Sequence, residues 1–271
     1  MQESAKADLS YAKAHAADLG IDEDVLEKLD IHVKILKNGP ARGHCDIVAS
    51  AFQSAGQRCS ALRVLCVQED IADRVVELLV GHMDELVVGD PSLLSTDVGP
   101  TIDEEARDIL VAHVARMEQA ATVVHRCELG DATGKGTFFA PTLIEIDSID
   151  ALEREVFGPV LHLLRFRGRK LAATIDAVNA TGYGLTMGLH SRIDSRARAL
   201  AARSGAGNLY INRNMIGAVV GVQPFGGRGL SGTGPKAGGP HYLPRFGTEM
   251  TVSNNIAAVG GNASLLSLES E

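Results

Sequence analysis

The chain has 271 residues, of which 45% are hydrophobic and 22% are charged, a balance that is ordinary for a globular protein of one large or two small domains. Its formal net charge of −8, without any run of lysine and arginine, argues against nucleic acid or an anionic membrane as a partner. No apolar stretch reaches the ~20 residues of a membrane span, and the first residues do not have the pattern of a signal peptide.

The first 45 residues differ in pattern from the rest of the chain. Residues 5–19 place apolar side chains on one helical face, and the run stops at Gly20. Residues 22–29 predict a short acidic helix, and residues 30–36 alternate weakly, as a strand does. We therefore predict a separate α/β leader segment over residues 1–45.

Part of this leader, residues 1–39, resembles the proteolytic domain of the Lon protease family. The resemblance is carried by Met1–Ser4, Leu19–Asp22, Glu27–Lys28 and Asp30–Val33. That family continues with Lys-Asp-Gly-Pro-Ser-Ala-Gly, whose serine is the nucleophile. Here the run is Lys37-Asn38-Gly39-Pro40-Ala41-Arg42-Gly43, with Ala41 in place of the serine. We expect no peptidase activity, and a degenerate peptidase fragment is the weakest of three interpretations. The junction at residues 39–46 is interpreted as a fusion or a gene-model error.

From Asp46 onward the pattern alternates between strands and helices. The predicted strands cover residues 62–67, 122–125, 160–166, 186–190 and 208–211. The predicted helices cover residues 70–86, 103–120, 169–180 and 194–203. Alternation of this kind indicates an α/β fold with a mostly parallel sheet flanked by helices.

Cys59 is the strongest candidate for chemistry. A helix-like run ends at Gly56 and a strand-like run begins near Leu62, so Cys59 lies on the short turn between them, next to Arg58. A turn of this kind can expose a nucleophilic thiol. The other cysteines are interpreted as buried structural residues: Cys45, Cys66 and Cys127. Because no C-x-x-C pair and no ligand-like histidine spacing occurs, we predict no metal site and no disulfide framework, and we expect a reducing cytoplasm.

Two motifs together resemble the aldehyde dehydrogenase superfamily. The run from Phe52 to Arg63 resembles its catalytic cysteine signature, and Glu155-Val156-Phe157-Gly158-Pro159 resembles its second signature. The resemblance implies NAD as cofactor, with Cys59 attacking an aldehyde to give a thiohemiacetal and then a thioester. It also implies that Glu155 accepts hydrogen bonds from the nicotinamide ribose and that Phe157 packs beside the nicotinamide.

A glycine-rich stretch, residues 217–240, is similar to the substrate loop of the Δ1-pyrroline-5-carboxylate dehydrogenase branch, including the dehydrogenase domain of proline utilization A proteins. The matching motifs are Asn212-Arg213-Asn214 and Phe225-Gly226-Gly227. The similarity implies that Ser60 and the backbone of Gly217 and Ala218 hold the α-carboxylate of a small aldehyde. It also implies that Phe225 forms one side of the pocket for the aldehyde group. Amides and a hydroxyl do form anion nests, but a loop that is glycine-rich only to turn tightly is the alternative.

The resemblance covers residues 46–271, with a catalytic domain at 46–250 and a flap or tail at 251–271. It implies oxidation of L-glutamate γ-semialdehyde to L-glutamate in proline catabolism, and a homodimer formed through the flap. The family's NAD domain, general base and oxyanion asparagine have no counterpart in residues 1–45, so we expect a truncated chain that is inactive alone. A non-enzymatic remnant that serves only association is the second interpretation.

Overall fold

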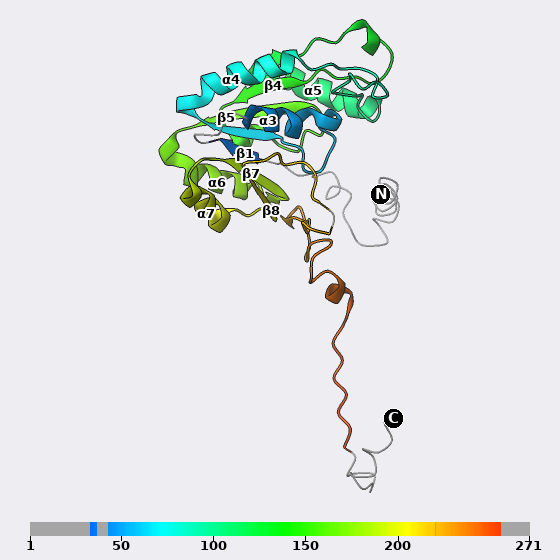
Figure 1. Ribbon diagram of the computed structural model, residues 1–271, viewed down its shortest axis with the longest axis vertical. Helices are drawn as coiled ribbons and strands as arrows, with labels where there is room; N and C mark the ends of the chain where they lie inside the picture. Colours follow the sequence, from blue (N-terminus) through cyan, green and yellow to red (C-terminus); the bar gives the residue numbers. More distant parts are fainter. Residues whose placement is uncertain (1–32, 37–42, 220, 256–271) are drawn as a thin grey trace.

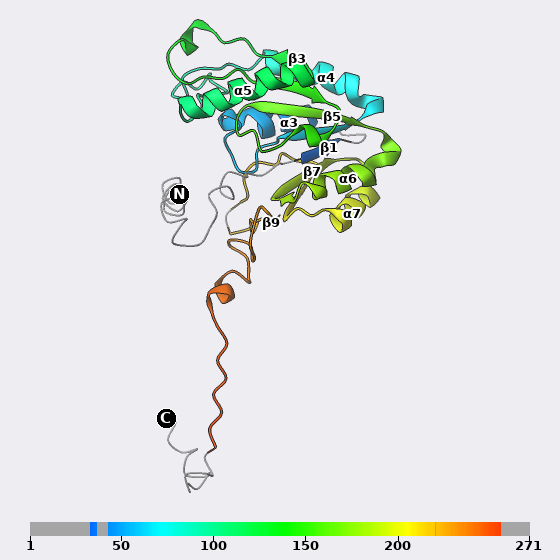
Figure 2. The same ribbon diagram turned by 180° about the vertical axis from the view of Figure 1, so that it is seen from behind.

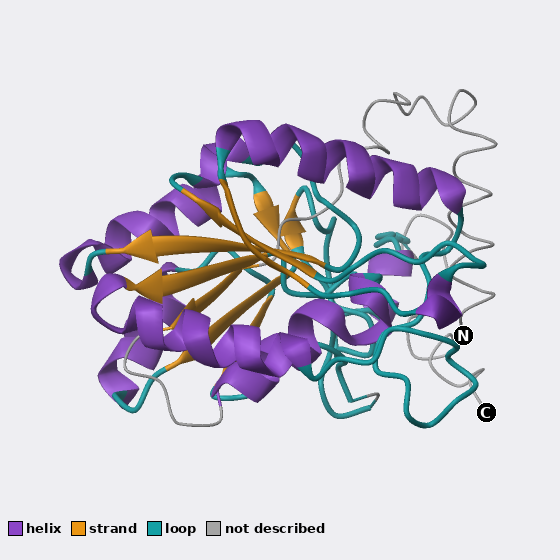
Figure 3. Cartoon of the chain, turned by 90° about the horizontal axis from the view of Figure 1, so that it is seen from above, coloured by secondary structure: helices purple, strands orange, loops and turns teal. Residues whose placement is uncertain are grey.

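A seven-stranded sheet with helices on both faces forms the body of the protein (Figures 1 and 3). The computed structural model describes residues 33–36, 43–219 and 221–255. The strand order is β3-β4-β5-β2-β1-β7-β8, and every neighbouring pair is parallel except β3 and β4. The predicted α/β class with a mostly parallel sheet is therefore confirmed.

The elements lie close to the predicted ranges. The strands of the sheet are β1 (Val33–Leu36), β2 (Val64–Gln68), β3 (Thr122–Arg126), β4 (Thr142–Ile146), β5 (Val160–Phe166), β7 (Thr186–His190) and β8 (Asn208–Ile211). A separate two-stranded ribbon pairs β6 (Tyr183–Gly184) with β9 (Arg228–Gly229). The helices are α3 (Gly43–Phe52), α4 (Glu69–Asp84), α5 (Glu104–Ala120), α6 (Leu171–Ala180) and α7 (Asp194–Arg203).

The apolar residues of β2 divide between two cores. Val64 and Cys66 pack with residues of α5, α6 and α7, while Leu65 and Val67 pack with residues of α3 and α4. Successive side chains of a strand point to opposite faces, so a strand covered on both faces is apolar at every position. For this reason the residues of β2 do not alternate between apolar and polar side chains, as those of a half-exposed strand do. Figure 3 shows the two helical layers on either side of the sheet.

The strand predicted within residues 30–36 forms as β1 and occupies the middle of the sheet. Val33 is in register with Val64 of β2 on one side and with Met187 of β7 on the other. Backbone from the leader segment thus joins the two halves of the sheet (Figure 1). The two helices predicted within residues 5–19 and 22–29 lie outside the described residues.

The ends of several elements follow their local chemistry. Asp103 caps α5 by accepting a hydrogen bond from the amide of Ala106 at 2.8 Å, as the predicted acidic start of this helix requires.

Residues 247–255 extend away from the sheet (Figures 1 and 2). Across the described ranges, no helix is both long and apolar enough to cross a membrane.

Candidate active site

Cys59 is exposed on the turn between α3 and β2, where the sequence predicts it. The turn begins with a left-handed stretch, in which φ is 57° at Ser54, 53° at Ala55 and 64° at Gly56. A left-handed residue with a side chain costs on the order of 1–2 kcal/mol, so the surrounding contacts must hold this conformation in place. Arg58 contributes one of them, because its Nε donates to the Ser54 hydroxyl at 2.9 Å.

Arg63 is the buried centre of the site. Its Nε donates to Glu155 Oε1 at 2.9 Å, and both side chains are at most 2% exposed. Its Nη1 donates to the carbonyl of Gly56 at 2.6 Å, and its Nη2 donates to the carbonyl of Arg58 at 3.2 Å. The guanidinium also lies 4.8 Å from the centre of the Phe157 ring. One side chain therefore joins the cysteine turn to the second signature.

The charge on Arg63 is compensated locally. Burial lowers the pKa of its guanidinium, and the Glu155 carboxylate, followed by Cys59, counteracts that shift. An unpaired buried charge would be costly, and the pair is stable here because the carboxylate and the backbone carbonyls satisfy its donors. The Glu155 carboxylate faces Arg63 in this arrangement, so its predicted contact with a ribose remains a prediction.

The two signatures also approach each other through their glycines. A Cβ on Gly56 would lie 2.2 Å from the carbonyl oxygen of Gly158, and a Cβ on Gly158 would lie 2.4 Å from Leu110 Cδ1. Neither separation is compatible with a side chain. The two backbones can therefore touch because position 56 is glycine, and glycine at position 158 leaves room for Leu110 of α5.

Ser50 of α3 links the cysteine turn to the start of the glycine-rich loop. Its carbonyl accepts a hydrogen bond from the amide of Leu62 at 2.8 Å, and its hydroxyl accepts one from the amide of Met215 at 3.0 Å. Tyr210 is also within electrostatic range of Cys59: burial raises the pKa of its phenol, Arg213 opposes this, and Cys59 adds to it. The loop that follows Tyr210 therefore starts near the thiol.

The four predicted substrate residues have different surroundings. Ser60 is buried directly after Cys59. Gly217 is exposed with φ at 73°, and Ala218 is half-buried. Phe225 is half-buried and exchanges two backbone hydrogen bonds with Ala237. Their joint contact with one substrate remains a prediction.

Sequence reasoning missed the roles of Arg63 and Ser50. Arg63 had a signal, because it is a charge inside the otherwise apolar run from Ala61 to Val67, and such a charge must find a buried partner. Ser50 had none, since its hydrogen bond with the amide of Met215 connects segments that are far apart in the sequence.

The remaining cysteines follow the prediction in two cases of three. Cys66 and Cys127 are buried, which raises the pKa of their thiols to about 12 and about 11. The prediction of a buried Cys45 is wrong, because this residue is exposed in the first turn of α3. The buried face of that helix is formed instead by later residues such as Ile47 and Ala51.

His162 and His113 form a hydrogen-bonded pair next to the backbone of Arg63. His162 of β5 is fully buried, and its Nδ1 lies 3.1 Å from the carbonyl oxygen of Arg63. Its Nε2 lies 2.9 Å from Nε2 of His113 on α5. Two neutral rings satisfy both contacts, with His162 donating to Arg63 and accepting from His113. Burial lowers the pKa of His162 to about 3 and that of His113 to about 4.

Comparison with known proteins agrees with this geometry. Residues 44–252 match the family model described as aldehyde dehydrogenase family. The chain belongs to the aldehyde dehydrogenase family. Both signatures, Phe52 to Arg63 and Glu155 to Pro159, lie within the matched residues.

This aldehyde dehydrogenase chain spans less than half the length of each of three relatives that it matches. The bifunctional protein PutA of Klebsiella aerogenes is 53% identical over 206 residues, which are 74% of this chain and 16% of the relative's length. A crystal structure of mutant PutA from Bradyrhizobium japonicum matches with a TM-score of 0.79 at 53% identity, over 86% of this chain and 24% of that one. A 1-pyrroline-5-carboxylate dehydrogenase from Thermus with bound NAD matches with a TM-score of 0.71 at 31% identity, over 81% and 42% of the two chains.

The close contact between Gly56 and Gly158 predicts that one added methyl group at position 56 strongly lowers the stability of the fold. In the Gly56→Ala variant we expect a loss of more than about 2 kcal/mol in the free energy of unfolding, because a left-handed conformation and a backbone clash both disfavour alanine. The matched control is Gly81→Ala in α4, where a Cβ meets no atom within 4 Å and alanine should stabilise the helix by up to about 1 kcal/mol. Urea unfolding measures both, and equal stabilities would contradict the predicted contact.

The histidine pair predicts a loss of stability in acid. Both rings have a lower pKa when folded than the usual value of about 6.5, so the unfolded chain binds more protons below that pH. Their contribution is fully present above pH ~6.5 and is lost as the pH falls toward about 4, by roughly 3 kcal/mol for each ring.

The measurement is the urea midpoint between pH 7 and pH 4.5, for the wild type and for His113→Gln, whose amide can still hydrogen-bond to His162. The variant should have a shallower pH dependence. The same slope in both proteins would show that the pair does not control acid stability.

Proposed function

We propose that this chain carries the nucleophile for the NAD-dependent oxidation of L-glutamate γ-semialdehyde to L-glutamate, a step of proline catabolism. The observation that carries the proposal is an exposed Cys59 on a turn that buried Arg63 ties to the Glu155–Pro159 segment. The names of two relatives, PutA and 1-pyrroline-5-carboxylate dehydrogenase, support this substrate.

The proposed chemistry takes place on the sulfur of Cys59. The thiolate attacks the aldehyde carbon, which forms a C–S bond and leaves the negative charge on the substrate oxygen. NAD, when bound, accepts the hydride that this carbon loses, so the substrate is oxidised to a thioester. Attack by water then breaks the C–S bond, releases the carboxylate and returns the thiol.

The residues around the thiol suit a nicotinamide ring. Phe157 is half-buried, and it shares Arg63 as a neighbour with Cys59. A flat apolar edge beside an exposed thiol is a suitable surface for an aromatic cofactor. For a ribose hydroxyl to reach Glu155, its carboxylate would have to turn partly away from Arg63.

Recognition of the α-carboxylate is assigned to Ser60 and the backbone of Gly217 and Ala218. Gly217 has a positive φ and open space around its Cα, so an anion can approach its amide closely. Phe225 is assigned to the aldehyde end of the substrate.

Protection against alkylation tests this proposal. Under iodoacetamide, exposed Cys59 and Cys45 should be labelled, and buried Cys66 and Cys127 should not. L-glutamate, the proposed product, should slow the labelling of Cys59 and leave Cys45 unchanged. The time course for each cysteine is measured by peptide mass spectrometry, so Cys45 serves as an internal reference.

Two controls sharpen the measurement. 4-Aminobutyrate is glutamate without its α-carboxylate and should protect Cys59 much less, and Ser60→Ala should weaken the protection by glutamate. Equal protection by both compounds would reject the carboxylate site. Equal effects on Cys59 and Cys45 would favour the non-enzymatic association remnant.

We further propose that a second copy of the chain covers the end of the C-terminal segment. Three apolar residues of this segment are highly exposed: Phe246 at 72%, Met250 at 84% and Val252 at 76%. We also propose a reducing cytoplasm as the compartment, because none of the four cysteines forms a disulfide bond.

This second proposal predicts a dimer whose dissociation constant rises when the exposed side chains are removed. Sedimentation equilibrium should show weaker association for the Phe246→Ser/Met250→Ser double variant than for the wild type. A wild-type chain that sediments as a monomer would reject the proposal. Ile109→Ser on α5 is the control, because Ile109 is also an exposed apolar residue and lies on another surface.

A further inference from the structure

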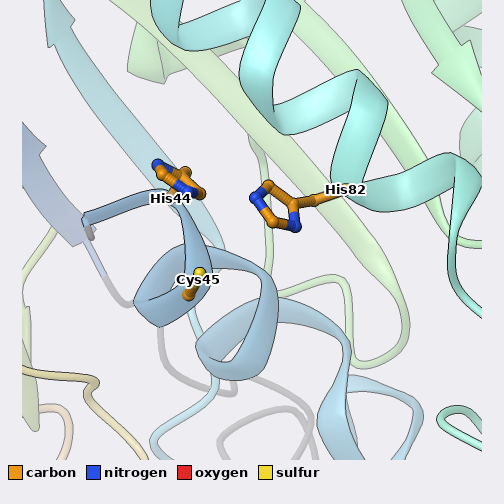
Figure 4. Close-up of side chains that lie close together, drawn as sticks. All are labelled: His44, Cys45 and His82. Atoms are coloured by element: carbon orange, nitrogen blue, oxygen red, sulfur yellow. The ribbon is translucent and has the colours of Figure 1, made fainter. Parts of the chain in front are cut away.

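Three metal-ligating side chains meet where α3 and α4 lie side by side. His44 and Cys45 are in the first turn of α3, and His82 is in the last turn of α4. One ligand atom from each residue lies within 4.8 Å of the other two. The rings of His44 and His82 stack with their centres 4.5 Å apart and an angle of 24° between their planes. Figure 4 shows the two rings facing each other above the sulfur of Cys45.

The ligand types suit zinc. Two imidazole nitrogens and one thiolate are nitrogen and sulfur ligands of the kind that zinc prefers, and three protein ligands leave a fourth position for water. Bond lengths of about 2.0 Å to nitrogen and 2.3 Å to sulfur place tetrahedral ligand atoms roughly 3.3–3.6 Å apart. The present cluster therefore needs to contract by only about 1 Å or a little more.

Side-chain rotation can supply this contraction. Cys45 is exposed, and His44 and His82 are half-buried, so no packed core holds any of the three side chains in place.

A cavity gives access to the cluster. It has a volume of about 440 Å³, and Cys45 and His82 contribute to its lining. Glu85 and Asp97 line the same cavity, so carboxylates are present to balance the charge of a cation or to bind its water. The fourth ligand position can thus be filled from solvent.

We propose that His44, Cys45 and His82 bind one zinc ion, which clamps the start of α3 to the end of α4. The site is separate from the nucleophile, because Cys45 is in the first turn of α3, a ten-residue helix ~15 Å long, and Cys59 is on the turn that follows the other end of this helix. The spacing of the residues predicts no metal site, since His82 is distant from His44 and Cys45 in the sequence. The tertiary structure alone brings the three together.

Cobalt is the direct probe, because a thiolate ligand gives Co²⁺ a charge-transfer band that oxygen and nitrogen ligands do not. The chain is stripped with a chelator, kept reduced and titrated with Co²⁺. One Co²⁺ per chain should bind with a thiolate band, and Zn²⁺ should displace it. Zinc should also raise the temperature of unfolding of the wild type.

The variants identify the ligands. Cys45→Ser should abolish the thiolate band, and His82→Gln and His44→Gln should each weaken zinc binding by at least about tenfold. Cys59→Ser and His241→Ala should bind as the wild type does. Circular dichroism of each variant verifies that it is folded.

Three results would overturn the proposal. The first is no saturable binding of Co²⁺ or Zn²⁺ to the folded wild type. The second is a thiolate band that survives in Cys45→Ser and disappears in Cys59→Ser, which would place the metal at the nucleophile. The third is binding that none of the three ligand variants weakens, which would indicate adventitious metal.

Discussion

The ion pair between Arg63 and Glu155 is the interaction on which the candidate active site depends. Both side chains are buried, so each would leave an uncompensated charge if the other were removed, at a cost of about 3–5 kcal/mol. The same guanidinium holds the carbonyls of Gly56 and Arg58. The guanidinium of Arg63 cannot move into solvent without breaking these hydrogen bonds and its ion pair. Arg63 therefore fixes the turn that carries Cys59.

The strands explain why the two signatures meet. The cysteine turn immediately precedes β2, and Glu155–Pro159 immediately precedes β5, and these two strands are parallel neighbours. Segments that precede neighbouring parallel strands reach the same edge of the sheet. At this edge the backbones of Gly56 and Gly158 are in contact, and the ion pair between Arg63 and Glu155 holds the two segments together.

Local patterns in the sequence were sufficient for most of the fold. The bounds of β5, β7, β8 and α7 match the predictions because polar, glycine or proline residues interrupt the pattern near both ends of each element. The strand β4 was missed, since its short run Thr142–Ile146 follows a proline and includes Glu145, which pairs with Arg165 of the next strand. The exposure of Cys59 was predictable because a turn between a helix and a strand lies at the surface.

The sequence by itself determined the α/β class, the family motifs and the exposed nucleophile, because each is carried by a continuous stretch of residues. Only the tertiary structure decided that β1 lies at the centre of the sheet, that Arg63 pairs with Glu155, and that His82 lies beside His44 and Cys45. These contacts join residues that are distant in the chain. They depend on strand order and helix packing, which the spacing of residues within one element does not specify.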